Sequence, residues 1–119
     1  MDDSQARKFQ KDLNAGLVAL VLLAVLDGSS EDLYGYEIAK RLQKANEGEA
    51  LFKEGTIYPV LRALAAGGFL TSRVVPSYSG PARRYYRITD SGRALLTQWS
   101  GIWRQTRGFV DRFIEGTHA

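Results

Sequence analysis

The sequence predicts a mainly α-helical fold with one small β-hairpin, and two patterns lead to this prediction. Over most of the chain, apolar residues recur every three or four positions, which is typical of helices that bury one face. Two short segments of alternating residues, 70–75 and 83–89, flank a stretch rich in turn-forming residues, as in a hairpin. The 119 residues are enough for one hydrophobic core but not for a second domain.

Composition excludes several classes of function. The net charge is only +3 with a pI near 9.3, which hints at a polyanionic partner, and Arg83, Arg84 and Arg87 form a local cluster of cations. The chain has no cysteine and a single histidine, His118, so a thiolate, zinc or nucleophile constellation is not expected. We therefore expect no enzyme activity, metal or cofactor, and a reducing cytoplasm is compatible with this composition.

The amino end and the longest apolar run argue against export and membrane insertion. The chain begins with an acidic Met-Asp-Asp segment, unlike the basic start of a signal peptide. The apolar run, residues 15–26, is shorter than the ~20 residues that span a bilayer. We expect a buried first helix that starts between Ser4 and Lys11 and ends near Leu26, in a cytoplasmic protein with no membrane partner.

A second helix is expected from about Leu33 to Ala45. Tyr34, Ile38 and Leu42 are spaced by four and should face the core. Its outer face is basic and is compatible with either simple solvation or contact with a phosphate backbone.

The third helix has an unusual outer face. Its apolar residues are Ile57, Val60, Leu61 and Leu64, whereas Gly55, Pro59, Arg62 and Ala66 lie opposite. Pro59 is tolerated near a helix start, so we expect the helix to begin no earlier than about Gly55, with Thr56 as its N-cap. Small side chains beside one arginine would let a partner approach closely.

Two helices with a short connection, followed by a hairpin, predict a helix-turn-helix with a wing. The link at 46–54 is longer than a compact turn, which a winged variant tolerates. Tyr86 and Ile88 should pack the hairpin on the helices, with Tyr85 half exposed. Arg87 is either a functional cation or an ordinary surface charge.

The last helix should be capped by Asp90 and Ser91 and opened by Gly92 and Arg93. A stripe with nearly a 3.5-residue repeat follows, which favours pairing with a second copy over a long core helix. The predicted dimerisation residues are Leu95, Trp99, Ile102, Phe109 and Phe113. Trp99 and Trp103 lie four apart, and they either pack in that interface or form a flat slot for a planar ligand.

These segments together resemble the PadR-like transcriptional regulators, of the short type with a single C-terminal dimerisation helix. The resemblance rests on Tyr34-Gly35-Tyr36-Glu37-Ile38, on residues 55–64, on Gly68-Phe69-Leu70, and on residues 83–89 with Gly92. It implies a winged helix-turn-helix DNA-binding domain at 1–89 and a dimerisation helix at 90–119. Two departures are Ala65-Ala66-Gly67-Gly68, where relatives commonly carry acidic residues, and Val74-Val75, where many have a tryptophan.

The resemblance also implies a function, a homodimeric repressor of operator DNA that a small aromatic or hydrophobic ligand releases. The predicted DNA contacts are Thr56, Tyr58 and Arg62 in the groove, and Lys53, Arg83 and Arg84 on the backbone. Tyr58 could instead be a core aromatic. The alternative function is a winged-helix protein-interaction module that does not bind DNA, which Glu47, Glu49 and Glu54 beside the third helix would favour.

Overall fold

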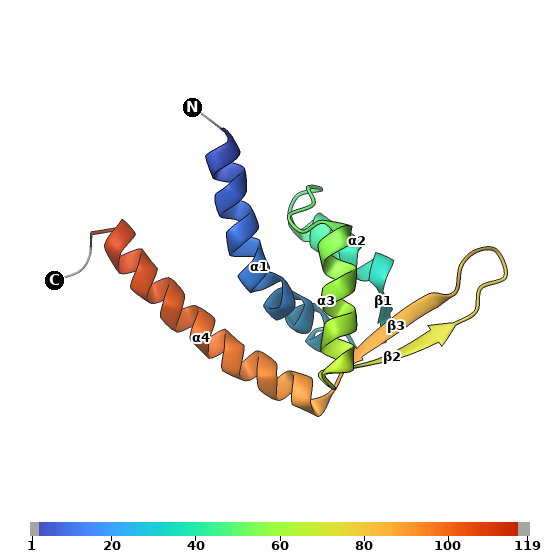
Figure 1. The fold of residues 1–119 in the computed structure, drawn as a ribbon. Coiled ribbons are helices and arrows are strands. Elements are labelled where there is room, and N and C mark those ends of the chain that lie inside the picture. Colours follow the sequence, from blue (N-terminus) through green and yellow to red (C-terminus); the bar gives the residue numbers. More distant parts are fainter. Residues whose placement is uncertain (1–2, 117–119) are drawn as a thin grey trace.

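The computed structural model describes residues 3–116, so Met1, Asp2 and the single histidine of the sequence, His118, lie outside the described residues. Its elements follow the predicted order of helices and hairpin, with one additional short strand (Figure 1). They are α1 (Asp3–Asp27), β1 (Leu33–Tyr34), α2 (Gly35–Ala45), α3 (Glu54–Ala66), β2 (Leu70–Val75), β3 (Arg83–Ile88) and α4 (Asp90–Ile114). The mainly helical winged fold expected from the sequence is confirmed.

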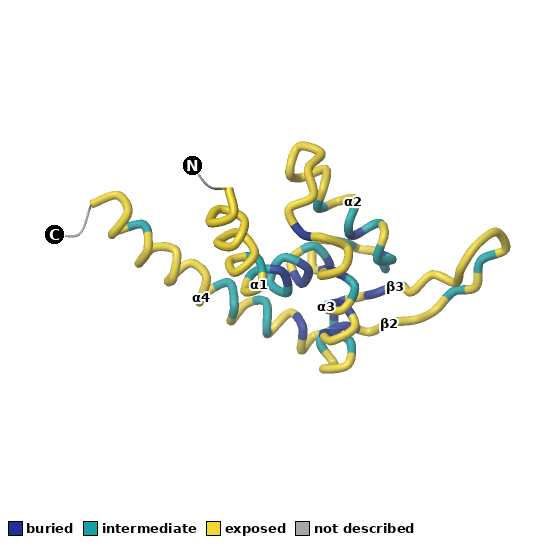
Figure 2. The backbone as a smooth tube through the Cα atoms, turned by 45° about the horizontal axis from the view of Figure 1, so that its top comes forward, coloured by how far each residue is buried: buried dark blue, intermediate teal, exposed yellow. Residues whose placement is uncertain are grey.

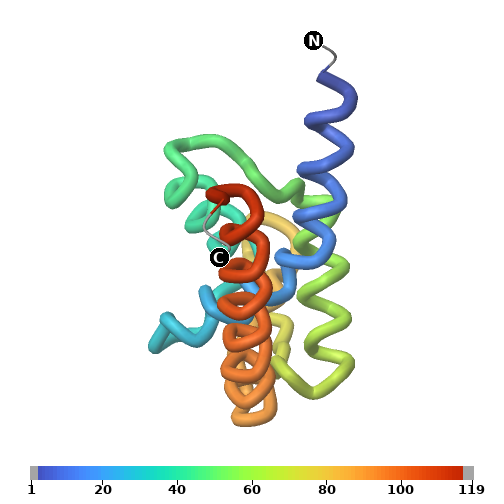
Figure 3. The backbone as a smooth tube through the Cα atoms, turned by 90° about the vertical axis from the view of Figure 1, so that its left-hand side faces the viewer, coloured from blue at the N-terminus to red at the C-terminus, as the bar shows by residue number. Residues whose placement is uncertain are grey.

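The second half of α1 is the centre of the core. Val18, Leu22, Leu23 and Leu26 are buried there, as the continuous apolar run predicts. The first half of the helix is exposed, and it extends beyond the other elements (Figures 2 and 3). Although the apolar run is short, α1 as a whole is long and apolar enough, by length and composition alone, to cross a membrane.

The prediction that the second helix starts near Leu33 is wrong. Leu33 and Tyr34 form β1, which pairs with Tyr86 and Tyr85 of β3, and α2 begins only at Gly35. The backbone amide of Tyr34 donates to the Glu37 carboxylate over 3.1 Å, which stabilises this junction. Leu33 of β1 and Ile38 of α2 are buried in the core, whereas Tyr34 is only half-buried.

The third helix starts one residue earlier than expected, and its cap is different. Lys53 is the N-cap, and its carbonyl accepts the amides of Thr56 and Ile57 at 2.9 and 3.0 Å. Thr56 is therefore a first-turn residue and not the predicted cap. Pro59 lies beyond the first turn of the helix. It has no N–H to donate to the carbonyl of Gly55, four residues earlier, and this is tolerated because Gly55 is exposed to water.

The two faces of α3 are those that the sequence predicts. Ile57, Leu61 and Leu64 are buried and Val60 is half-buried. The opposite residues are all exposed, namely Gly55, Pro59, Arg62 and Ala66. The helix stops at Gly67 and Gly68, and Gly68 has a φ of +83°.

The sheet is antiparallel with the strand order β1-β3-β2. Tyr86 lies opposite both Leu33 and Ser72, and Ile88 lies opposite Leu70. Tyr86 and Ile88 are buried and Tyr85 is half-buried, which confirms the predicted packing of the hairpin. Beyond these residues the hairpin projects away from the helices as the wing (Figure 1).

Thr89, and not the predicted Asp90–Ser91 pair, caps α4. Its hydroxyl accepts the amide of Gly92 at 3.0 Å and donates to the carbonyl of Gly68 at 2.8 Å, so it joins this helix to the end of α3. Thr89 is extended, which places Asp90 inside the first turn. The start of α4 packs on the core, and from Gly101 onward the helix is almost entirely exposed and diverges from α1 (Figures 1 and 2).

Candidate nucleic-acid interface

A groove lies between the outer side of α3, the start of α2 and the wing. It has a volume of about 710 Å³ and meets a second hollow of about 320 Å³ at Arg62, Arg84 and Tyr86. The larger hollow brings together four of the predicted site residues, Tyr58, Arg62, Arg83 and Arg84. The groove therefore collects guanidinium groups from two separate elements beside tyrosine rings, a combination suited to a polyanion.

Tyr58 packs partly against the core and also lines the groove, so its predicted role as a DNA contact stays a prediction. The ring is half-buried beside the core and lies against the backbone of Gly35, where a Cβ atom would come within 2.6 Å of Tyr58 Cε1. Burial, and secondarily the charge of Glu54, raises the pKa of Tyr58 above its usual value. The hydroxyl thus stays protonated at neutral pH and remains able to donate a hydrogen bond.

Arg62 and Arg84 both line the two hollows, as does the buried Tyr86. Burial raises the pKa of Tyr86, and the positive charges of Arg84 and Arg62 oppose that rise, which places both guanidinium groups near the phenol. Arg84 donates to the Ser72 hydroxyl over 3.3 Å, and Arg62 is exposed. One cation from the helix and one from the wing therefore border the same space.

The two neighbouring wing arginines, predicted to act alike, lie on opposite faces of the hairpin. Successive strand residues alternate between faces, so Arg84 shares the inner face with Tyr86. Arg83 lies on the outer face, with its guanidinium carbon 4.6 Å from the ring centre of Tyr34. Both line the larger hollow, but of the two only Arg84 also lines the smaller hollow beside α3.

Lys53 and Thr56 are not among the residues that line either hollow. Both are exposed at the first turn of α3, with Lys53 as the N-cap. Their roles as DNA contacts stay predictions.

Sequence reasoning missed two groove residues, Tyr34 and Tyr36. They flank Gly35 at the junction of β1 and α2, and both line the larger hollow. The aromatic pair around a glycine is visible in the sequence. However, a helix that starts at Leu33 would place Tyr34 on its buried face and not at the groove. Residues 79–82 of the wing loop complete this side of the groove.

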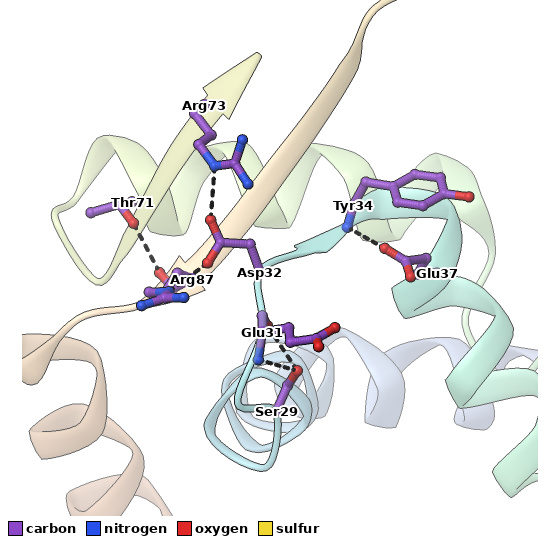
Figure 4. A network of polar contacts seen from close by, with 8 residues as sticks. All are labelled: Ser29, Glu31, Asp32, Tyr34, Glu37, Thr71, Arg73 and Arg87. Atoms are coloured by element: carbon purple, nitrogen blue, oxygen red, sulfur yellow. Dashed lines mark hydrogen bonds and ion pairs between the residues drawn. The ribbon is translucent and has the colours of Figure 1, made fainter. Parts of the chain in front are cut away.

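Arg87 has a structural partner. Its Nε donates to one carboxylate oxygen of Asp32, and Arg73 Nε donates to the other at 2.9 Å (Figure 4). The hydrogen bond from Arg73 has the largest effect and lowers the pKa of Asp32. Burial opposes it, but the hydrogen bond from Arg87 and the positive charges of both arginines keep the pKa below its usual value. Arg87 therefore fastens the sheet rather than extending the groove.

The predicted dimerisation stripe divides into two parts. Leu95 and Trp99 are half-buried against the chain's own core, whereas Ile102, Phe109 and Phe113 are 55%, 55% and 60% exposed. Trp103 is 37% exposed, and neither tryptophan lines the hollows of the groove. Within residues 3–116, no group of three or more acidic or histidine side chains is placed to hold a metal ion.

Comparisons with known proteins agree with this architecture. Residues 22–98 match the model of the transcriptional regulator PadR-like family. The chain is 54% identical over 46 residues to "Transcriptional regulator Rv3488" of Mycobacterium tuberculosis, which covers 37% of this chain and 40% of that one. It is similar to a PadR family transcriptional regulator of Eggerthella lenta, with a TM-score of 0.78 and 29% identity over 95% of each chain.

A further similar structure is Bacillus subtilis PadR in complex with operator DNA. Its TM-score is 0.61 at 28% identity, over 70% of this chain and 47% of that chain. The family match spans the end of α1, all of α2, α3 and the sheet with its wing, and the start of α4. This chain belongs to the PadR-like family of transcriptional regulators.

Proposed function

We propose that this protein binds operator DNA as a homodimer and represses transcription from it. The observation that carries the proposal is the convergence of Tyr58, Arg62 and Arg84 on one groove between α3 and the wing. The similarity to a PadR protein solved with operator DNA supports it.

The outer face of α3 suits a DNA groove. Gly55, Pro59 and Ala66 are exposed and small, so the helix backbone can come close to base edges while Arg62 reaches further. An arginine in the major groove pairs with guanine, and arginines on a wing bind phosphates. In this proposal Arg62 reads bases, Arg84 and Arg83 hold the backbone, and Thr56 and Lys53 contact the DNA at the start of the helix.

The homodimer would cover the apolar surface that one chain leaves exposed. This surface lies on the first half of α1 and the second half of α4, and it includes Phe9, Leu13, Ile102, Phe109 and Phe113. Several large apolar side chains exposed along a helix mark an interface in soluble proteins, and a two-fold dimer would cover both copies at once. The dimer would also place two grooves on one DNA duplex.

Release by a small planar aromatic or hydrophobic effector completes the proposal, with Trp99 and Trp103 as its candidate site. Trp99 packs partly on the core while Trp103 is more open, so an effector between two copies could contact both rings. Tryptophan fluorescence during titration with hydroxycinnamates and planar cationic dyes tests this part. Saturable quenching at micromolar concentration supports a slot, and no quenching across the panel means that the rings only pack.

The experiment for the whole proposal is a mobility shift on the DNA upstream of the protein's own gene, at two salt concentrations. We expect a shifted complex that weakens steeply with salt, because phosphate contacts release counterions. If the folded dimer shifts no DNA at low salt, the wing serves another partner, as in the protein-interaction alternative.

A further inference from the structure

The outer face of the sheet carries a continuous series of rings and cations. The Arg73 guanidinium carbon lies 4.9 Å from the ring centre of Tyr85, and the rings of Tyr85 and Tyr34 are 5.4 Å apart. Arg83 lies over the other side of the series, 4.6 Å from the Tyr34 ring centre. Cations over tyrosine faces and tilted ring pairs are both attractive arrangements.

The series continues from the sheet onto α2. The ring of Tyr34 stacks on that of Tyr36 at 6.2 Å, and Lys40 Nζ lies 5.5 Å from the Tyr36 ring centre. We call this set the cation–aromatic ladder, which consists of Arg73, Tyr85, Tyr34, Arg83, Tyr36 and Lys40. It connects both wing strands to β1 and to the helix that packs on α3.

Asp32 fastens one end of the ladder. It directly precedes β1, and its carboxylate accepts Nε of Arg73 from β2 and Nε of Arg87 from β3 (Figure 4). Its side chain is only 17% exposed, whereas both arginine side chains are 59% exposed. One carboxylate thus joins the three strands of the sheet on this face.

The opposite face does not hold the outer half of the hairpin. Burial on that face ends at Tyr86, and the next residues outward, Arg84 and Val74, are exposed, Val74 by 51%. A two-stranded hairpin is only marginally stable by itself. The contacts that fix the direction of the wing therefore lie on the outer face.

We propose that Asp32 and the cation–aromatic ladder are positioning elements, which hold the wing at a fixed angle to α3 and so set the separation of Arg84 and Arg62. Asp32 and Tyr85 do not line the groove, so they act through Arg84 and not on the DNA. The consequence for DNA binding rests on the proposed function, but the fixed wing angle does not.

The wing angle can be measured without DNA because the chain has no cysteine. Spin labels on cysteines at the exposed Ser79 of the wing and Lys44 of α2 would report it, with unlabelled chain in excess so that dimers carry one labelled copy. We expect a narrow distance distribution for the wild type and Tyr85→Phe, and about twice the width for Tyr85→Leu and Asp32→Asn, since the hairpin alone is marginal. Thr71→Val is the matched control on the same sheet face, and circular dichroism checks the fold of each variant.

A second measurement links the wing angle to DNA. Arg84→Ala should weaken binding to a duplex of upstream DNA less in a Tyr85→Leu background than in the wild type, because a displaced Arg84 already contributes less to binding. An unchanged distance distribution in folded Tyr85→Leu and Asp32→Asn overturns the positioning role. A broadened distribution with a full Arg84→Ala effect overturns its link to DNA. If the distance distribution broadens in Tyr85→Leu and Asp32→Asn but the wild-type protein binds no DNA, only the proposed function is overturned.

Discussion

Gly35 lies directly against the ring of Tyr58, so that a Cβ atom on Gly35 would be 2.6 Å from Tyr58 Cε1 and 3.0 Å from Cδ1. Because the ring is half-buried on α3, it can move away only by losing its packing. The glycine between Tyr34 and Tyr36 thus lets the start of α2 approach the helix that faces the groove.

The first prediction follows from this contact. Gly35→Ala should lower the free energy of unfolding by about 1–3 kcal/mol, because a methyl group is forced against a packed ring. Urea denaturation measures it. The control is Gly55→Ala in α3, where an added Cβ meets no atom within 4 Å. Because alanine is more stable than glycine in a helix, this change should raise the free energy of unfolding by about 0.5–1 kcal/mol. Equal stability of Gly35→Ala and the wild type would contradict the contact.

The second prediction concerns the cap of α4. Thr89→Ala should cost about 1–2 kcal/mol, since it removes the hydroxyl that accepts the Gly92 amide and donates to the Gly68 carbonyl. Thr89→Ser keeps that hydroxyl and should recover most of the loss. Thermal and urea unfolding of the three proteins decide the matter, and a Thr89→Ser variant as unstable as Thr89→Ala shows that the hydroxyl is not responsible.

The third prediction is a pH dependence that involves Asp32. Its pKa is lowered in the folded protein by Arg73 and Arg87, so its contribution to stability is present above its ordinary pKa and is lost as the pH falls through the folded value. Asp32→Asn should therefore destabilise the protein at pH 7 and make less difference at pH 3. Urea denaturation of both proteins across this pH range tests the sign. A difference in the free energy of unfolding that grows as the pH falls would contradict the prediction.

The fourth prediction separates the two arginines of the groove. Arg62→Ala should weaken operator binding by about 1–3 kcal/mol and relax base preference, whereas Arg84→Ala should weaken all sequences alike and reduce the salt slope by about one. Fluorescence anisotropy with operator and scrambled duplexes distinguishes these effects. Arg104→Ala is the matched control, because this exposed arginine lies on α4 and lines neither hollow of the groove, and its loss should leave the base preference unchanged. Unchanged operator binding by Arg62→Ala would remove α3 from recognition.

The fifth prediction concerns the dimer. Ile102→Glu and Phe109→Glu place charges on the exposed apolar stripe of α4, so they should produce folded monomers. Arg104→Glu, on the opposite side of the same helix, should leave the dimer intact. Sedimentation velocity gives the oligomeric state. Dimers that persist in both stripe variants would place the interface elsewhere.

The sequence predicted those parts of the fold that have a long periodic pattern. The buried face of α3, the two wing strands and the inward Tyr86 and Ile88 were predictable because each follows from helical spacing or strand alternation. The strand β1 was not, because two residues carry no period, and their pairing with Tyr85 and Tyr86 is made by the tertiary fold.

The candidate site shows the same division. Arg62 and Tyr58 could be placed beside the groove from the pattern of one helix. The different positions of Arg83 and Arg84 follow from strand alternation, but the ring under Arg83 belongs to β1 and so depended on the missed strand. Asp32 is far from Arg73 and Arg87 in the sequence, and only the folded sheet brings the three together.

The most direct test of the central claim, that α3 and the wing bind operator DNA, is hydroxyl-radical footprinting of the protein on the DNA upstream of its own gene. We predict two protected half-sites with two-fold symmetry, about one or two helical turns apart, and their loss in Arg62→Ala. Uniform cleavage along that DNA with the folded wild-type dimer, or the same footprint with Arg62→Ala, would contradict the claim.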